Sequence, residues 1–527
     1  MKYIRHVATK VTPQHEPILG SAQVANSAGG YAFPVTDWVQ LDRFLILGTE
    51  GGSYYASEHK LTRESAEAVL RCIKEDGARA VARIREISVS GRAPKNDPAI
   101  FALAMAAKLG DEPTRRAAFA AMPEVARTST HLFQFAEALQ GFGGWGRATT
   151  RAVAAWYERE QVGQLAYQAI KYRQREGWTH ADLLRLSHPK APGAAHKELY
   201  AWMVDGIAPS DNQELKQIRA FDDLQKATSG SEAGKLIRDF NLPWEAVPTE
   251  LRSDSDVWAA LLEEMPMTAM IRNLATMTRV GLLAPMSEAA TKVATELRDR
   301  ERIRKARLHP IAILVALKTY QQGHGERGKH TWTPVQQVVD ALNDAFYLAF
   351  DNAPSTGLRW LLGVDVSGSM SMGQVAGAAG LTPRVAATAM ALVTAATEPK
   401  HHIMAFQHTL VPLNISPRQR LDDAVAMTAR LPFGGTDCAL PMLYALEHKV
   451  HVDVFVVLTD SETWFGNVHP VQALRRYREK TGIAAKLVVV GMVANKFSIA
   501  DPADAGMLDV VGFDTAVPSL IHDFAVN

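Results

Sequence analysis

The sequence Asp365-Val366-Ser367-Gly368-Ser369 directly follows the apolar run Trp360-Leu361-Leu362-Gly363-Val364. An apolar run of this kind indicates a buried strand, and the Asp-x-Ser-x-Ser motif at its end places one carboxylate and two hydroxyls on one tight loop. Hard oxygen donors of this type are the ligands that Mg²⁺ and Mn²⁺ prefer. Because the motif is short, it indicates a metal site only if other segments place further oxygen ligands at the same edge of a sheet.

Two later segments are expected at that edge. Gly434-Gly435-Thr436-Asp437 is a glycine turn that presents a hydroxyl, and Val454-Phe455-Val456-Val457-Leu458-Thr459-Asp460 is a second apolar strand that ends in a carboxylate. In an open parallel sheet, ligands bind at the carboxyl ends of the strands. The sequence therefore predicts one divalent cation, most simply Mg²⁺ with Mn²⁺ or Ca²⁺ as alternatives, held by Asp365, Ser367, Ser369, Thr436 and Asp460. The alternative is that these are only the serine- and glycine-rich turns of a generic doubly wound sheet.

The pattern around these loops alternates between strands and helices. Strand-like runs occur at residues 360–366, 403–406, 454–458 and 486–490, with helical runs at 384–397 and 471–480 between them. Such alternation predicts a parallel sheet that is covered by helices on both faces.

Residues 60–350 have a different pattern, that of successive helices with short connections, which predicts an α-solenoid or a bundle. Met122-Pro123 and Met265-Pro266 are each expected to open a helix, since proline is tolerated at the first helical position. A Pro/Ser/Thr/Gly stretch at 352–357 marks the boundary, so we expect a helical domain at 1–355 and an α/β domain at 356–527.

Composition limits the class of protein. At 527 residues the chain exceeds one hydrophobic core, and its net charge of +1 does not by itself indicate nucleic-acid binding. Only Cys72 and Cys438 occur, which excludes a disulfide framework and fits a reducing compartment. The N-terminal residues 1–6 lack a signal-peptide core, and no apolar run is long enough to span a membrane. We therefore expect a cytoplasmic protein with no membrane partner.

A basic and aromatic stretch begins at Lys171-Tyr172-Arg173-Gln174-Arg175-Glu176-Gly177-Trp178-Thr179-His180. Cations neutralise phosphates and flat side chains stack on bases, so the stretch is typical of RNA binding. The spacing of Lys171 and Arg175 is that of one helical face. The candidate RNA-binding residues are Lys171, Arg173, Arg175, His180, Arg185 and His188. The alternative is a solvated helix face without a ligand.

The glycine loop Gly323-His324-Gly325-Glu326-Arg327-Gly328-Lys329 matches both G-x-G-x-x-G and the start of a Walker A loop. Both motifs require a preceding strand, whereas residues 310–322 favour a helix. His330 also stands where Walker A needs Ser or Thr. An inter-helix loop is the better interpretation, although Arg327 and Lys329 can still contact phosphate.

Taken together, these segments resemble one family, the Ro autoantigen ribonucleoproteins, in which a TROVE domain precedes a von Willebrand A domain. The three cation-binding segments are similar to the metal-ion-dependent adhesion site of that second domain. The blocks that carry the resemblance are Ala28-Gly29-Gly30-Tyr31, residues 47–52, Lys171-Tyr172 with Arg175, Gly177-Trp178, residues 182–188, residues 307–310, Gly323-His324-Gly325, residues 364–367, residues 434–438 and Ala500-Asp501-Pro502.

The resemblance implies a ring of HEAT-like helical repeats, closed by the α/β domain, around a central hole. It implies a noncatalytic scaffold that binds small noncoding Y RNA on its outer surface, where Lys171, Arg175 and His188 take the contacting positions. It also implies that single-stranded ends of misfolded or precursor RNA enter the hole, in RNA quality control with exoribonucleases during stress. The alternative function is a protein-interaction module in which a partner's carboxylate completes the Mg²⁺ shell.

Overall fold

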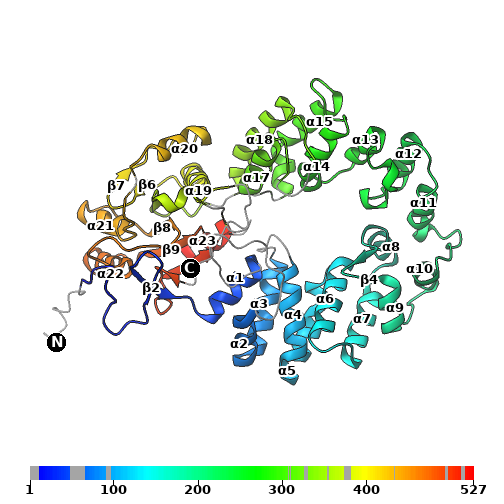
Figure 1. The fold of residues 1–527 in the computed structure, drawn as a ribbon, viewed down its shortest axis with the longest axis horizontal. Helices are drawn as coiled ribbons and strands as arrows, with labels where there is room; N and C mark the ends of the chain where they lie inside the picture. The colour runs from blue at the N-terminus through cyan, green and yellow to red at the C-terminus, as the bar shows by residue number, and fades with distance from the viewer. Residues whose placement is uncertain are drawn as a thin grey trace. The chain divides into compact units, whose positions relative to one another are not determined.

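The computed structural model describes residues 11–47, 66–90, 96–306, 308, 310–325, 330–352, 355–372, 375, 381–432, 434–492, 497–511 and 517–526. The chain divides into two compact units (Figure 1). We call the first the α/β unit; it comprises Met1–Ala68, Arg307–Lys318 and Ala345–Asn527. The second, the helical unit, comprises Val69–Ala306 and Thr319–Asp344. No helix within the described ranges is both long enough and apolar enough to cross a membrane.

The region that the sequence predicted to be helical is helical, with neighbours in sequence packed together, such as α4 with α5 and α6, α9 with α10, and α12 with α13. Many helices begin at side-chain caps: Asp76, Asp111, Thr128, Ser229 and Ser287 each accept a bond from a first-turn amide. The helices are α2 Glu67–Glu75, α3 Gly77–Val89, α4 Asp97–Leu109, α5 Glu112–Val125, α6 Ser129–Gly141, α7 Arg147–Arg159, α8 Val162–Lys171, α9 His180–Ser187, α10 Ala194–Asp205, α11 Lys216–Leu224, α12 Gly230–Phe240, α13 Ser255–Glu263, α14 Met267–Arg279, α15 Glu288–Leu297, α16 Arg300–Lys305, α17 Pro310–Gln321 and α18 Gln336–Leu348.

The two Met-Pro pairs behave differently. Pro266 caps the N-terminus of α14, as predicted. The prediction for Met122-Pro123 was wrong, because Pro123 lies inside the last part of α5. Short 3₁₀ segments complete the helical elements: η2 Gln213–Leu215, η3 Trp244–Ala246, η4 Thr249–Leu251, η5 Ala349–Asn352 and η6 Gly368–Ser371.

The α/β unit contains a six-stranded sheet in the order β11-β9-β8-β5-β6-β7. The four predicted strands are present and parallel, as β5 Trp360–Asp365, β6 His401–Phe406, β8 Val454–Thr459 and β9 Lys486–Gly491. Two strands were not predicted: β11 Met507–Val511 extends the parallel part, and β7 Leu410–Pro412 pairs antiparallel with β6 at the edge. The sheet is therefore mixed. The unit's helices are α1 Asp37–Leu47, α19 Pro383–Thr397, α20 Leu421–Ala429, α21 Leu440–Glu447, α22 Pro470–Thr481 and α23 Val517–Val526.

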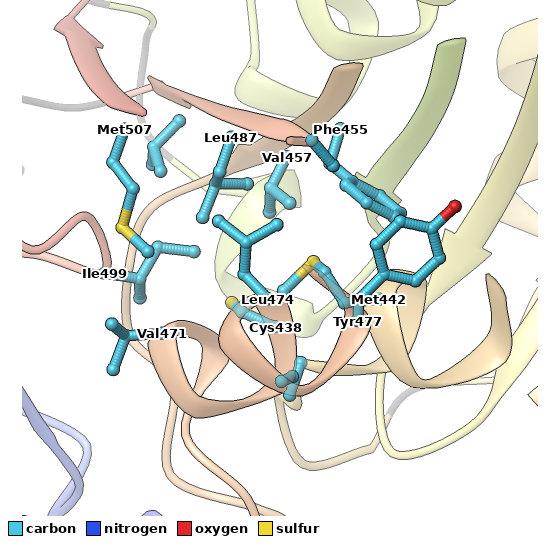
Figure 2. Packing of buried hydrophobic residues seen from close by; sticks show 14 of the residues in the cluster. Cys438, Met442, Phe455, Val457, Val471, Leu474, Tyr477, Leu487, Ile499 and Met507 are labelled. Carbon is cyan, nitrogen blue, oxygen red and sulfur yellow. The ribbon is translucent and has the colours of Figure 1, made fainter. Parts of the chain in front are cut away.

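Both faces of the sheet are buried, which explains why β5 and β8 are continuous apolar runs rather than alternating ones. One face packs against α21 and α22 through Leu361, Phe455, Val457 and Leu487 from the strands and Met442, Leu474 and Tyr477 from the helices (Figure 2). Helix α19 contacts β5, β6 and β8 but contributes no described residue to this cluster, so it covers the other face.

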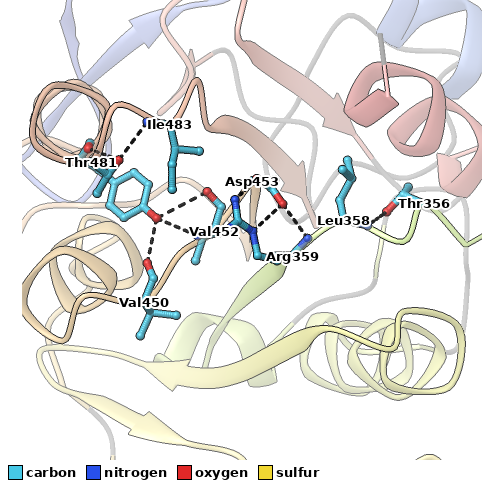
Figure 3. Close-up of polar contacts among 9 residues, drawn as sticks. Thr356, Leu358, Arg359, Val450, Val452, Asp453, Thr481 and Ile483 are labelled. Carbon is cyan, nitrogen blue, oxygen red and sulfur yellow. Dashed lines mark hydrogen bonds and ion pairs between the residues drawn. The ribbon is translucent and has the colours of Figure 1, made fainter.

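Polar contacts fix β8 beside β5 at the end opposite the predicted cation site (Figure 3). The Arg359 guanidinium, just before β5, donates to both oxygens of Asp453, just before β8, at 2.5 and 2.9 Å. This pairing holds the pKa of Asp453 below its usual range. The Tyr477 hydroxyl accepts from the Val452 amide at 2.7 Å and donates to the Val450 carbonyl at 2.8 Å. These contacts set the register from which both strands run to the site.

The N-terminal segment, residues 11–47, packs within the α/β unit. Strand β2 Tyr31–Pro34 pairs antiparallel with β1 Val24–Ala25 and with β10 Phe497–Ser498. In α1, Arg43 forms a buried ion pair with Asp509 of β11 at 2.7 Å. The predicted domain boundary near residue 355 assigns the N-terminal segment to the helical domain, and so it does not predict the pairing of this segment with β10 and β11. The blocks that carry the resemblance also include residues 48–52, Arg307 and His309, which lie outside the described residues.

Candidate metal site and RNA-binding surface

The Asp-x-Ser-x-Ser loop lies at the carboxyl end of β5, as predicted. Asp365 is the last residue of that strand and is completely buried. Its Oδ1 accepts from the Ser367 amide at 2.8 Å, and its Oδ2 accepts from the Thr459 hydroxyl at 2.7 Å. The hydroxyls of Ser367 and Ser369 are 3.1 Å apart. The bond from the Ser367 amide closes the loop, and the bond from the Thr459 hydroxyl joins the loop to the end of the neighbouring strand, β8.

The structure brings the glycine turn and the end of β8 to the same place. Thr436 is buried, and its carbonyl accepts from the amides of Trp464 and Phe465, both at 3.1 Å. Those two residues follow Asp460, which is buried and accepts from the Glu462 amide at 3.1 Å. All five predicted ligands therefore lie at one edge of the sheet, on three loops that hydrogen bonds connect.

The glycine pair at the turn is required by close packing. A Cβ on Gly434 would lie 2.1 Å from the Gln407 amide oxygen, and a Cβ on Gly435 would lie 2.9 Å from the Phe465 ring. Real Cβ atoms do not make contacts this short, so a side chain at either position would require the neighbouring side chains to move. Glycine thus lets the loop that carries Thr436 approach both neighbouring loops.

The charges at this edge fit a small divalent cation. Burial, and then the nearby Asp460 carboxylate, raise the pKa of Asp365 to about 7. Burial also raises the pKa of Asp437 to about 6, against hydrogen bonds from Ala439 and Gln14. Buried carboxylates that repel one another are stabilised by a cation between them. Two carboxylates and three hydroxyls form the hard oxygen set suited to Mg²⁺, and Asp365, Ser367, Ser369, Thr436 and Asp460 would hold it.

The N-terminal segment makes a contribution to the site that the sequence did not predict. Gln14 is completely buried, and its amide nitrogen donates to Asp437 Oδ1 at 2.6 Å and to the Val468 carbonyl at 2.8 Å. Its amide oxygen accepts from the Thr463 hydroxyl, which also contacts the Thr436 carbonyl at 3.3 Å. One side chain therefore joins the glycine turn to the loop after β8.

Asn26 and Gly30 hold the same loop from another point of this segment. The Asn26 side-chain nitrogen donates to the Thr463 carbonyl at 2.6 Å, and the Ala28 amide donates to the Glu462 carboxylate at 3.0 Å. A Cβ on Gly30 would lie 2.0 Å from the Thr463 carbonyl oxygen, so only glycine fits. The Ala28-Gly29-Gly30-Tyr31 block of the resemblance therefore has a structural cause. This block is the feature of the sequence from which the contact between the N-terminal segment and the loop after β8 could have been predicted.

The predicted RNA-binding residues lie in the helical unit, around the end of α8. Lys171 is the last residue of α8, with its Nζ 5.6 Å from the centre of the Tyr167 ring and 5.4 Å from that of Tyr172. Burial lowers its pKa, but the two tyrosines and Glu245 act in the opposite direction and the net shift is upward. The ammonium is therefore charged at neutral pH.

The prediction that Lys171 and Arg175 share a helical face was wrong. After α8 the chain forms a small hairpin, β3 Gln174–Arg175 and β4 Trp178–Thr179, with Glu176 and Gly177 at positive φ in its turn. Arg175 is exposed on this hairpin and pairs with Glu176 at 3.1 Å. The Arg173 guanidinium, also exposed, lies 5.1 Å from the centre of the Phe221 ring on α11.

His180 requires a correction. It is buried, its Nδ1 is 2.9 Å from the Tyr157 hydroxyl, and its ring packs against Phe133. Burial lowers its pKa to about 4, so the ring is neutral at physiological pH. We therefore remove His180 from the residues expected to contact RNA.

The remaining two candidates stay at the surface. Arg185 is exposed, and its guanidinium donates to the Val204 carbonyl at 3.2 Å. His188 is exposed at the left-handed C-cap of α9. We call Lys171, Arg173, Arg175, Arg185 and His188 the basic surface.

The glycine loop does not have the context of a nucleotide-binding loop. Helix α17 Pro310–Gln321 precedes it where a strand is needed, and His324 pairs with Thr331 in an isolated bridge. Arg327 and Lys329 lie outside the described residues. The inter-helix interpretation is confirmed for the described part of the loop.

Comparisons with known proteins cover almost the whole chain. Residues 24–232 and 208–319 match the TROVE domain, and residues 359–525 match the Ro60 vWA domain. The chain is 45% identical over 516 residues to RNA-binding protein RO60 of Deinococcus radiodurans, covering 97% of each. It is 35% identical to RNA-binding protein RO60 of Caenorhabditis elegans, covering 98% of this chain and 92% of that protein.

A solved structure agrees with these sequence matches. The crystal structure of the Deinococcus radiodurans RO (RSR) protein superimposes with a TM-score of 0.78 at 44% identity, over 93% of this chain and 99% of that chain. The chain belongs to the Ro60 family, in which a TROVE domain is followed by a Ro60 von Willebrand A domain.

Proposed function

We propose that this protein is a noncatalytic RNA-binding scaffold of a ribonucleoprotein. The observation that supports the proposal is the basic surface, whose five residues belong to the part of the chain that matches the TROVE domain. The names of the relatives from Deinococcus radiodurans and Caenorhabditis elegans, both RNA-binding proteins, support it. Cations at the surface neutralise phosphates, so binding is electrostatic and does not require a reaction.

The finer parts of the proposal come from family membership. Small noncoding Y RNA binds the basic surface, and single-stranded ends of misfolded or precursor RNA enter a central hole. The complex acts in the cytoplasm and presents such RNA to exoribonucleases in quality control under stress. The predicted cation, Mg²⁺ rather than Mn²⁺ or Ca²⁺, belongs to the other unit and serves protein contacts rather than RNA binding.

Replacing Lys171 and Arg175 together with alanine should weaken binding of a structured small RNA and flatten its salt dependence. Each lost phosphate contact reduces the steepness of log affinity against log salt by about 0.7 to 0.9, so the loss of two contacts reduces it by about 1.4 to 1.8. Fluorescence anisotropy with a labelled RNA hairpin across salt concentrations measures both quantities.

The matched control is Lys235→Ala with Lys292→Ala, which removes the same charge from exposed positions on α12 and α15. This control should retain nearly the wild-type slope. Equal slopes for both double variants would show that the basic surface does not contact RNA phosphates.

A further inference from the structure

Residues 12–28 of the N-terminal segment, which we call the strap, contact the loop after β8 and the first turn of α22. At one end of the strap, the Thr12 amide donates to the Gln472 side-chain oxygen at 3.0 Å, and the Thr12 hydroxyl accepts from the Gln472 side-chain nitrogen at 3.1 Å. Towards the other end, Asn26 donates to the Thr463 carbonyl at 2.6 Å. The middle of the strap contacts one completely buried imidazole, that of His469.

The hydrogen bonds of His469 determine where its ring carries a proton. The Glu16 carbonyl, which can only accept, lies 2.8 Å from Nε2, so Nε2 is protonated. The Gln23 side-chain nitrogen, which can only donate, lies 3.2 Å from Nδ1, so Nδ1 is not protonated. The orientation of the Gln23 side chain is fixed, because its oxygen accepts from the Ile18 amide at 2.8 Å. The ring is therefore neutral while the strap is in place.

A second proton on this ring would find no acceptor in the strap. On Nδ1 it would face the Gln23 amide nitrogen, which is itself a donor, and Gln23 cannot turn round without giving up its bond from Ile18. His469 is also the N-cap of α22, where the helix dipole disfavours a cation. Burial lowers the pKa of His469, against the opposing effect of the Glu16 and Pro13 carbonyls. The proton therefore binds more tightly once the strap has moved away.

The charged side chains of the segments around His469 have partners of their own. The pairs are His15 with Glu16, Glu462 with the Ala28 amide, Asp460 with the Glu462 amide, Asp437 with Gln14, and Arg475, the first charged residue of α22, with Asp501. Burial raises the pKa of Asp437 and of Glu462. Protonation of these two carboxyls favours the folded state, so their effect on stability is opposite in sign to that of the imidazole.

We propose that His469 is a pH-sensitive switch that releases the strap in acid. Protonation of Nδ1 breaks its contact with Gln23, and the strap leaves the loop after β8. Because the proton favours the open state, the imidazole lowers the free energy of opening only below pH 6.5, the ordinary pKa of histidine. Acid thereby increases the mobility of a loop at the edge of the sheet where the predicted cation ligands lie.

The experiment measures hydrogen exchange of the strap amides by mass spectrometry, without divalent cations, from about pH 8 to about pH 5, the range in which histidine titrates. The comparison is with His469→Gln, whose amide can donate to the Glu16 carbonyl and accept from Gln23 but does not titrate. Both proteins keep the same carboxyls, so the ratio of their protection factors isolates the imidazole. Protection in the wild type relative to the variant should fall by up to about tenfold per pH unit below 6.5, because opening takes up one proton.

Two further variants make the test specific. Gln23→Glu supplies a carboxylate that can accept from protonated Nδ1 and still accept from the Ile18 amide, so acid should no longer reduce the protection of the strap. His15→Gln is the matched control, since it removes an exposed histidine from the same strap. It should keep the pH dependence of the wild type.

Three results would overturn the proposal. The first is the same pH dependence in the wild type and in His469→Gln, which would show that the imidazole does not control the strap. The second is loss of the pH dependence in His15→Gln, which would assign it to the exposed histidine. The third is loss of protection in β8 together with the strap, since the α/β unit would then open as a whole rather than release one segment.

Discussion

Replacing Asp365 with asparagine should reduce divalent-cation affinity by more than about 100-fold, beyond the 10- to 100-fold lost when a supporting partner of a metal ligand is removed. Asparagine has nearly the same shape: its oxygen can accept from the Ser367 amide, and its NH2 group can donate to the Thr459 hydroxyl, which now donates to Asp365. The variant therefore removes the charge without emptying the buried position. Isothermal titration with Mg²⁺, and separately with Mn²⁺ and Ca²⁺, measures the loss.

The control is Asp423→Asn, which removes an exposed carboxylate on α20 in the same unit. It should bind the cation as the wild type does. Because the site is in the α/β unit, neither variant should alter RNA affinity. Undiminished cation binding by Asp365→Asn would exclude Asp365 as a ligand.

The same site should show a defined pH dependence. The pKa of Asp365 is raised to about 7 by burial and by Asp460, so below that pH a cation must displace a proton. Apparent Mg²⁺ affinity should therefore rise as the pH rises through about 7. Without the cation, stability changes in the opposite direction. The folded state holds the Asp365 proton more tightly than the unfolded state does, because its pKa is raised from 3.8 to about 7. The free energy of unfolding therefore falls as the pH rises from 3.8 towards 7. Isothermal titrations with Mg²⁺ at several pH values test the predicted rise in apparent affinity.

Gln14→Leu should loosen the loops that carry Thr436 and Asp460. The substitution removes the buried bonds to Asp437, Val468 and Thr463, and each buried group left unsatisfied costs about 1–3 kcal/mol. We expect the free energy of local opening to fall by about 3 kcal/mol and the cation affinity to fall by about tenfold. Hydrogen exchange of the amides in residues 460–468, read by mass spectrometry, reports the local opening.

The control for this prediction is Gln40→Leu, which removes a single partly buried bond to the Val35 carbonyl. It should leave exchange at 460–468 unchanged. Equal protection of these amides in Gln14→Leu and the wild type would show that the N-terminal segment does not brace the site.

The convergence of the five predicted cation ligands could be predicted because each of their loops has a recognisable pattern in the local sequence. Asp365 and Asp460 follow apolar runs that are buried on both faces, and the rule for parallel sheets then brings their ends together. Thr436 was found through its glycine pair, which the structure explains by the close approach of Gln407 and Phe465. Nothing local predicts Gln14, since its contact with Asp437 spans 423 residues and depends on tertiary folding.

The basic surface was predictable in its location but not in its backbone. Two-residue strands such as β3 and β4 carry almost no periodicity, so the sequence predicts a continuing helix where the structure has the hairpin after Lys171. His180 was placed with the cations because of its neighbours in sequence. Its spacing with the buried Leu183, Leu184 and Ser187 on α9 is the pattern of a core-facing helix stripe, and weighing that pattern would have excluded it.

The central claim is that the protein binds RNA without cleaving it. The most direct measurement is a native-gel titration of end-labelled RNA, carrying a structured stem and a single-stranded end, by purified protein with Mg²⁺, followed by recovery of the bound RNA on a denaturing gel. The account predicts a complex that weakens steeply between about 50 and 200 mM salt and RNA recovered at full length. Absence of a complex at low salt would contradict it, and so would shortened RNA whose formation disappears in Asp365→Asn.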